Sequence, residues 1–141
     1  MPRVRKAVAY VVREGQLLVF RHRDVDLAVA GVQVPAGTIR DGEDPADAAV
    51  REAEEETGLT GLRIVGMLGV SDYDVRPGRR EIHERHFFQL TTTGPVQDEW
   101  LWHERHDGVG EPTPFVCSWI PLGQAHVLAA GFGALVGAIS G

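Results

Sequence analysis

Four glutamates fall within five consecutive residues of the sequence, at positions 52, 54, 55 and 56. Glu52, Glu55 and Glu56 are three and four residues apart, so they share one face if this segment is helical. Like charges at these spacings repel each other by roughly 0.2–0.5 kcal/mol per pair. A divalent cation would turn that repulsion into attraction, because carboxylate oxygens are preferred ligands of Mg²⁺ and Mn²⁺. Mg²⁺ is usually held by a few carboxylates together with substrate phosphates, so the spacing predicts polyphosphate chemistry.

A helix over residues 45–57 is predicted to position these carboxylates. Asp44 is suited to cap its N-terminus, Pro45 to occupy its first turn and Gly58 to end it. The face of this helix that is expected to pack against a β-sheet consists of Ala46, Ala49, Val50, Ala53 and Thr57.

The segment before this helix, PAGTIRDGE, contains Gly37 and Gly42, where the backbone can bend. We expect Gly37 to turn its carbonyl group towards the same metal ion. Arg51 is predicted to pair either with Asp47, four residues away, or with Glu43, which would fix the loop. Glu43 is therefore interpreted as a structural residue rather than as a metal ligand.

Residues 37–59 resemble the Nudix box, G-x5-E-x7-R-E-U-x-E-E-x-G-U, in which U is an aliphatic residue. The pattern is far more specific than a lone glycine motif, and the first U position holds an alanine. All fixed positions are filled, by Gly37, Glu43, Arg51, Glu52, Ala53, Glu55, Glu56, Gly58 and Leu59.

The resemblance implies a pyrophosphohydrolase that cleaves a nucleoside diphosphate linked to another group, by metal-assisted attack of water on phosphorus. Nucleoside triphosphates, nucleotide sugars, ADP-ribose and dinucleoside polyphosphates are all substrates of this kind. Mg²⁺ is the implied cofactor, with Mn²⁺ as a substitute. The implied metal ligands are Gly37, Glu52, Glu55 and Glu56, and the implied catalytic residues are Arg51, Glu52 and Glu55. The general base belongs either to the helix or to a later segment, where the candidates are Glu84, Glu99 and Glu104.

The alternative function is a Nudix-fold module that binds or senses a nucleotide without hydrolysing it. Degenerate boxes usually mark that class, whereas this box is intact. Arg79, Arg80 and Arg85 either clamp the outer phosphates of a substrate or form a basic surface patch. Trp100 and Trp102 are two residues apart on one face of a strand, and we predict core or dimer packing for them rather than base stacking.

The composition limits the partners of the chain. Its 141 residues have the size of one domain, and residues 1–141 are predicted to form a single one. The formal net charge of −6 argues against stable binding of nucleic acid or of an anionic membrane. We therefore expect a small-molecule nucleotide as the partner and leave homodimerisation open. Cys117 has no second cysteine to pair with, which favours a reducing, cytoplasmic location.

The remaining segments predict an α+β fold with a mixed β-sheet, similar to the Nudix α/β/α sandwich. An apolar segment over residues 124–139 is predicted to form a second helix. Strands are predicted at residues 6–12 and 17–22, which would form a hairpin, and at residues 32–34, 62–70, 81–93, 99–104 and 114–120.

Overall fold

The computed structural model describes residues 1–105 and 108–140. Its strands are β1 (Arg3–Arg13), β2 (Gln16–His22), β3 (Ala36–Thr38), β4 (Leu62–Asp74), β5 (Ile82–Thr92), β6 (Glu99–Glu104) and β7 (Thr113–Pro121). Its helical segments are α1 (Leu27–Ala30), α2 (Pro45–Thr57) and the 3₁₀ turns η2 (Leu122–Val127) and η3 (Val136–Ala138).

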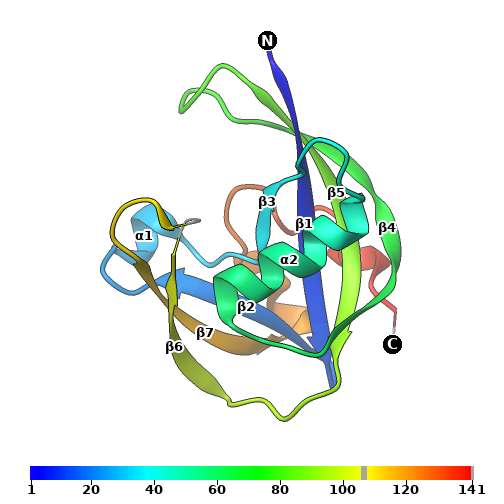
Figure 1. Ribbon diagram of the computed structural model, residues 1–141, viewed down its shortest axis with the longest axis vertical. Helices are drawn as coiled ribbons and strands as arrows, with labels where there is room; N and C mark the ends of the chain where they lie inside the picture. The colour runs from blue at the N-terminus through cyan, green and yellow to red at the C-terminus, as the bar shows by residue number, and fades with distance from the viewer. Residues whose placement is uncertain (106–107, 141) are drawn as a thin grey trace.

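The strands form one mixed sheet in the order β4-β5-β1-β2-β7-β6, with β3 paired to β1 (Figure 1). β1 and β5 run parallel along most of the length of β1, and the other pairs are antiparallel. β1 pairs with β2 only next to their hairpin, so the same edge of β1 is free for β3 further along. The mixed sheet and the α+β class are thus confirmed.

The predicted helix is confirmed as α2, with the predicted caps at both ends. The Asp44 side chain accepts a hydrogen bond of 2.8 Å from the Ala46 N–H, and Gly58 adopts a left-handed conformation with φ of 74°. Both arrangements satisfy backbone groups that a helix terminus leaves unpaired. The register of the glutamates along α2 is therefore fixed by local signals at its two ends.

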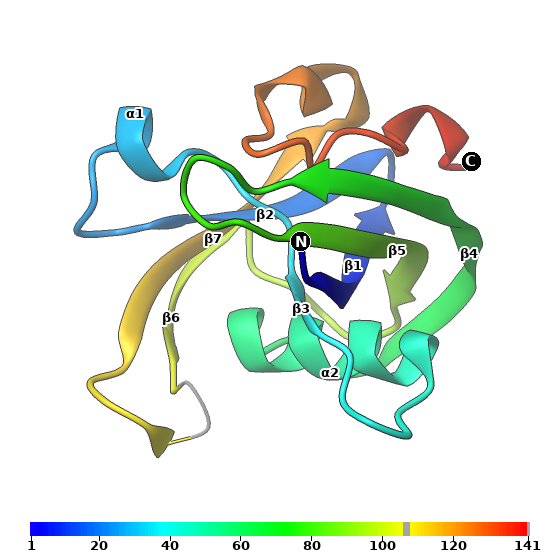
Figure 2. The ribbon, with the colours of Figure 1, turned by 90° about the horizontal axis from the view of Figure 1, so that it is seen from above.

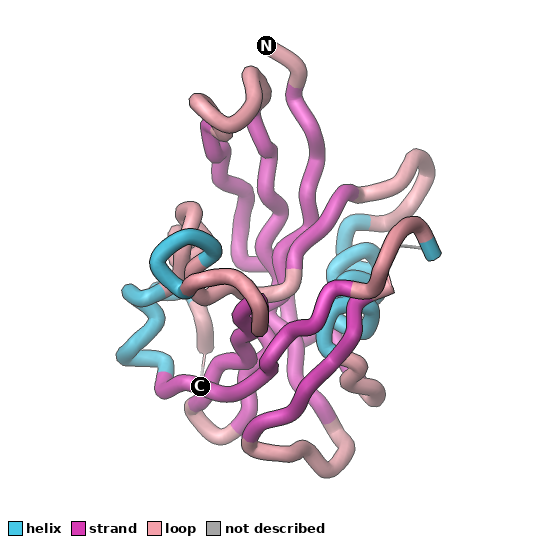
Figure 3. The backbone as a smooth tube through the Cα atoms, turned by 90° about the vertical axis from the view of Figure 1, so that its left-hand side faces the viewer, coloured by secondary structure: helices cyan, strands magenta, loops and turns pink. Residues whose placement is uncertain are grey.

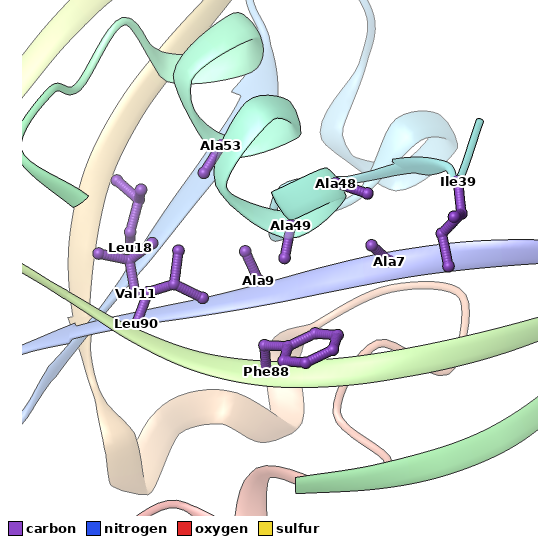
Figure 4. Packing of buried hydrophobic residues seen from close by; sticks show 10 residues of the cluster. All are labelled: Ala7, Ala9, Val11, Leu18, Ile39, Ala48, Ala49, Ala53, Phe88 and Leu90. Atoms are coloured by element: carbon purple, nitrogen blue, oxygen red, sulfur yellow. The ribbon is translucent and has the colours of Figure 1, made fainter. Parts of the chain in front are cut away.

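Alanines on α2 let the helix approach the sheet closely. α2 lies along one side of the sheet (Figure 2). Figure 4 shows Ala49 of the helix close to Ala9 of β1, and Ala48 close to Ala7. All four side chains are fully buried. Small residues on both surfaces leave little space between helix and strand, so the carboxylates of α2 are held at a fixed height above the sheet.

The predicted helix over residues 124–139 is wrong, because this segment forms only the short turns η2 and η3. Ala130 and Gly131 have positive φ angles of 53° and 73°, which an α-helix does not allow. The segment nevertheless covers the opposite side of the sheet from α2, so that helical segments flank the strands on both sides (Figures 2 and 3). Its apolar side chains pack against a second core of buried residues that includes Val8, Tyr10 and Phe87.

The other strand predictions are confirmed except at residues 32–34. Val32 and Gln33 form only isolated bridges, and the strand β3 begins after Pro35, which has no N–H group to donate to a ladder. β4 also extends to Asp74 instead of ending at residue 70. No helix among residues 1–105 and 108–140 has the length and apolar character needed to cross a membrane.

Candidate active site

Gly37 and Glu52 meet where β3 runs past α2. A Cβ atom on Gly37 would overlap the carboxylate of Glu52, so the missing side chain is what makes room for that carboxylate. The Glu52 side chain is only 13% exposed. Burial raises the pKa of its carboxyl group, although Arg51 opposes this effect. Gly37 of β3 and Glu52 of α2 therefore form one largely buried acidic corner.

Glu56 lies deeper in the same corner and is 8% exposed. Its Oε1 atom accepts a hydrogen bond of 3.0 Å from the backbone N–H of Ala36. Burial, and then the charge of Glu52, raise the pKa of Glu56 well above its usual value. Glu52 is thus a close acidic neighbour of Glu56, and its negative charge disfavours a second negative charge at that position. A cation bound between the two carboxyl groups would relieve this repulsion.

Arg51 organises the acidic groups around it. Its Nε and Nη2 atoms donate to the two carboxylate oxygens of Glu43 at 2.8 and 2.9 Å, which is a bidentate pair. Its Nη1 atom donates to Glu52 at 2.7 Å and lies 3.4 Å from Glu55, and Nη2 also reaches the carbonyl of Thr38 at 3.1 Å. The Arg51 guanidinium lowers the pKa of Glu43 to about 2. Of the two predicted partners of Arg51, the structure selects Glu43, whose role is structural.

The carboxylates of the acidic corner provide some, but not all, of the ligands that a hard divalent cation needs. Glu55 is 33% exposed and lies at the rim, with Arg40 3.9 Å away, while Glu52 and Glu56 lie further inside. In the described part of the chain, no three His, Cys, Asp or Glu side chains already converge on one point. Arg51 holds Glu52 and Glu55 by hydrogen bonds and is therefore the group that a cation would compete with. Such an incomplete set suits Mg²⁺, which keeps water and substrate phosphates in its coordination sphere.

The sequence model of the NUDIX domain family matches residues 2–134. The chain belongs to the Nudix family. The acidic corner is formed by its Nudix box, residues 37–59, and every element of that box lies within the matched region.

The curated relatives that the chain matches carry the names of different hydrolases. The chain is 29% identical over 133 residues to the RNA pyrophosphohydrolase of Dinoroseobacter shibae, covering 79% of this chain and 83% of that protein. It is 37% identical over 73 residues to the RNA pyrophosphohydrolase of Cereibacter sphaeroides, covering 50% of this chain and 44% of the relative. It is 38% identical over 58 residues to the ADP-ribose pyrophosphatase of Bacillus subtilis, covering 41% and 31%. In the last two cases the match spans less than half of the curated relative.

Solved structures confirm the Nudix fold. The MutT protein from Methanosarcina mazei Go1 matches with a TM-score of 0.67 and 18% identity, covering 96% of this chain and 91% of that one. The MutT Nudix hydrolase from Burkholderia pseudomallei matches with a TM-score of 0.63 and 18% identity, covering 99% and 100%. At such identities the likeness concerns the backbone arrangement.

The three candidates for a general base outside the Nudix box lie in different surroundings. Glu84 on β5 is engaged by His86 at 2.8 Å and by Arg3 at 3.4 Å. Glu99 opens β6, at the end of that strand remote from Glu104. The charge of Glu104 reaches the Nudix box, where it contributes to raising the pKa of Glu56. Glu104 also lines a surface hollow together with Glu55, whereas Glu84 belongs to another ion-pair network.

A cavity of about 370 Å³ borders the Nudix box at Gly37. The sequence pointed to Arg85 and Gly37 from this cavity but not to Lys6, Tyr73 and Phe132. They come from β1, β4 and the C-terminal segment, which no local pattern connects. The lining includes Lys6, Gln33, Gly37, Tyr73, Arg85 and Phe132. Arg79, in contrast, is 72% exposed, so the predicted arginine group is divided between the cavity and the surface.

Trp100 and Trp102 hold the C-terminal end of α2. Their indole N–H groups donate to the carbonyls of Thr57 at 2.7 Å and of Glu55 at 2.8 Å. These carbonyls belong to the last turn of the helix, which has no further helical partners. A Cβ atom on Gly58 would overlap the Trp102 ring. The two tryptophans are therefore half-buried and pack against the Nudix helix, in agreement with the predicted packing role.

Proposed function

We propose that this chain is a metal-dependent Nudix pyrophosphohydrolase. The observation that carries the proposal is the acidic corner, where Gly37 makes room for Glu52 beside the buried Glu56. Two neighbouring carboxyl groups whose pKa values are raised by burial are unfavourable in a purely structural role. The loss of stability that this pair of carboxyl groups causes is offset if the protein functions with a cation bound between them.

The implied metal ligands are Glu52, Glu55, Glu56 and the carbonyl of Gly37. A bound Mg²⁺ or Mn²⁺ would neutralise the charge of the pyrophosphate group and lower the pKa of water. Arg51 orients Glu52, fixes the loop before α2 through Glu43, and donates to the carbonyl of Thr38, next to Gly37 on β3. Hydrolysis forms a bond between the water oxygen and phosphorus, breaks the phosphoanhydride bond and releases one proton. Glu52, Glu55 or Glu104 accepts that proton as the general base.

The test is a release assay with Mg²⁺ and with Mn²⁺ over nucleoside triphosphates, nucleotide sugars, ADP-ribose and dinucleoside polyphosphates. A 5′-triphosphorylated oligonucleotide is included because several relatives bear the name RNA pyrophosphohydrolase. We expect metal-dependent turnover of at least one compound. Saturable binding without any product would instead support the alternative, a Nudix-fold nucleotide sensor. A single-domain, cytoplasmic protein remains the prediction, and homodimerisation remains open.

Metal binding is expected to stabilise the folded protein. At a Mn²⁺ concentration about ten times the Kd, the stabilisation is about 1.4 kcal/mol, which corresponds to a rise in Tm of about 5 °C for a domain of this size. Differential scanning fluorimetry of the metal-free protein with added Mn²⁺ or Mg²⁺ measures this shift. A Tm that stays constant up to millimolar metal would contradict the proposed ligand set.

Replacing Gly37 with alanine is expected to lower turnover about 100-fold, because the new methyl group displaces the Glu52 carboxylate by more than its working tolerance. Gly42→Ala, in the turn between β3 and α2, is the matched control. Its φ angle is 77° and no atom lies near the added carbon, so it should cost about 1 kcal/mol of stability without affecting turnover. Equal activities of the two variants would show that the contact between Gly37 and Glu52 is not required.

A further inference from the structure

Two cations face each other on the sheet beside the Nudix box. Lys6 of β1 and Arg85 of β5 are directly paired in the parallel register, so their side chains lie on the same face. Like charges on directly opposite residues of neighbouring strands destabilise a sheet. The charge of Arg85 is one of the influences that lower the pKa of Lys6, after burial. As with the carboxylates of the acidic corner, two like charges lie side by side, and a bound group of opposite charge would relieve their repulsion.

Arg85 is held by neutral groups. Arg85 is only 4% exposed, and its Nη1 atom donates a hydrogen bond of 2.6 Å to the carbonyl of Ala130. The guanidinium carbon lies 4.1 Å from the ring centroids of both Tyr73 and Phe132. Two aromatic rings stack on the guanidinium and leave its edge as the part that can donate further hydrogen bonds. Burial accordingly lowers the pKa of Arg85.

Neither cation forms an ion pair with a carboxylate among the described residues. Lys6 donates to the hydroxyl of Thr38 at 2.8 Å. Glu81 and Glu52 act on Lys6 only at longer range. Glu81 is itself engaged by His83 at 2.6 Å. A guanidinium this deeply buried normally pairs with an anion, so the local charge balance is incomplete.

Arg85 and Lys6 both line the same cavity of about 370 Å³, which has the size of a small-ligand site. Gly37 lines this cavity too, and it also contacts Glu52 of the acidic corner. A group bound in the cavity therefore lies immediately beside the diphosphate that the Nudix box would hold. The two sites are close enough to receive two parts of one molecule.

We infer that this cavity, through Lys6 and the edge of Arg85, binds an anionic group of the substrate, either a phosphoryl or a carboxylate group, attached to the moiety beyond the cleaved diphosphate. The inference rests on the proposed function for the location of the diphosphate. It names the substrate class as nucleoside diphosphates linked to an acidic moiety, in preference to those linked to a neutral sugar. The planar guanidinium fork suits both anions because it donates two parallel hydrogen bonds.

The first test measures binding to the cavity alone, without metal and without a cleavable anhydride. Ribose 5-phosphate is titrated into the ¹⁵N-labelled protein, with ribose as the neutral counterpart, and the amide signals of Gly37 and Ala130 report binding. Glucuronate and glucose form the second pair, which separates a carboxylate from a phosphoryl preference. We expect saturable shifts with at least one anion and none with its neutral counterpart.

Arg85→Met should weaken binding of the anion at least tenfold, as expected for loss of a charge-assisted hydrogen bond. Lys6→Met, which removes the facing charge, should weaken it by a similar factor. Arg63→Met is the matched control, because it removes the same charge from an exposed side chain of β4 outside the cavity, and should change the affinity less than twofold. Arg85→Lys keeps the charge without the fork and should show intermediate binding. If Arg85→Met does not fold, the lysine variant and Lys6→Met carry the test.

Three results would overturn the inference: no binding of either anion, binding that Arg85→Met and Lys6→Met leave unchanged, or Arg85-dependent binding of guanosine in place of the anions. The last result would assign the cavity to a nucleobase edge. Because the titration uses no metal and no diphosphate, a negative result leaves the proposed hydrolase activity untouched. Absent turnover in the release assay, conversely, leaves the binding result untouched.

Discussion

Replacing Glu56 with glutamine is expected to lower turnover by about 1000-fold while leaving the fold intact. The variant removes one charged ligand from the acidic corner, and several kcal/mol of transition-state stabilisation depend on the cation that this ligand helps to hold. Glutamine retains an oxygen that can accept the hydrogen bond from the Ala36 N–H, so the local backbone keeps its partner. The release assay and the Mn²⁺ affinity of the variant measure the effect.

The same substitution is expected to stabilise the metal-free protein at neutral pH by about 1 kcal/mol, because it removes a buried charge beside Glu52. The folded-state pKa of Glu56 is raised, so its contribution to stability is complete below the unfolded pKa and is lost as the pH rises through the folded pKa. Chemical unfolding with a chelator present, from pH 4.5 upward, should show this loss in the wild type but not in the variant.

Glu54→Gln is the matched control, because it makes the same charge change on an exposed position of the same helix. It should retain turnover, Mn²⁺ affinity and the pH dependence of stability. Similar losses of turnover in both glutamine variants would show that the net charge of the helix matters rather than the position of Glu56. Full activity of Glu56→Gln would remove Glu56 from the ligand set.

Replacing Arg51 with glutamine is expected to lower the free energy of unfolding by about 3 kcal/mol. The side chains of Arg51, Glu43 and Glu52 are 18%, 16% and 13% exposed, and removing the shared cation leaves the carboxylates partly buried without a counter-charge. Removing one partner from such a network lowers the free energy of unfolding much more than losing a surface ion pair does. Urea unfolding at pH 7 without metal measures the change.

Arg63→Gln on β4 is the control for Arg51, because Arg63 is exposed. It should change the free energy of unfolding by less than about 0.5 kcal/mol. Arg51→Lys should fall between the two, because an ammonium group cannot donate bidentately to Glu43 and also reach Glu52 and Thr38. Equal stabilities of the three variants would mean that the loop before α2 does not depend on Arg51.

The Nudix helix was predictable because its signals are local. Asp44 and Gly58 fix its ends within single turns, and the spacing of Glu52, Glu55 and Glu56 then follows from helix geometry. The family pattern added the loop around Gly37. What the sequence did not reveal is that Arg51 holds Glu52 and Glu55 and that Glu56 is buried. The burial of Glu56 depends on where the sheet lies, whereas Arg51 and Glu55 are four residues apart on the helix, a spacing at which such pairs form locally.

The C-terminal segment and the cavity were not predictable, for different physical reasons. Residues 124–139 are apolar enough for a helix, but the positive φ angles at Ala130 and Gly131 fit tertiary packing rather than a helix. Of these two residues, only Gly131 is of a type that readily adopts a positive φ angle, so only there does the sequence itself argue against a helix. The pairing of Lys6 with Arg85 needs the parallel register of β1 and β5, which joins segments far apart in the sequence. Tyr73 and Phe132 enter the cavity by the same non-local route.

The indole contacts at the end of α2 provide an intrinsic optical probe. Trp100 and Trp102 are two of the three tryptophans of the chain, and both donate to carbonyls in the last turn of the Nudix helix. Indole emission shifts in wavelength with the polarity and hydrogen bonding of its surroundings. Occupation of the acidic corner one turn away should therefore be visible in the emission of the unlabelled protein. The ring of Trp119, which donates to the Gln97 carbonyl instead, lies 6.3 Å from the ring of Trp100, so Trp102→Phe is the variant that separates the signal of the helix end from that of this pair.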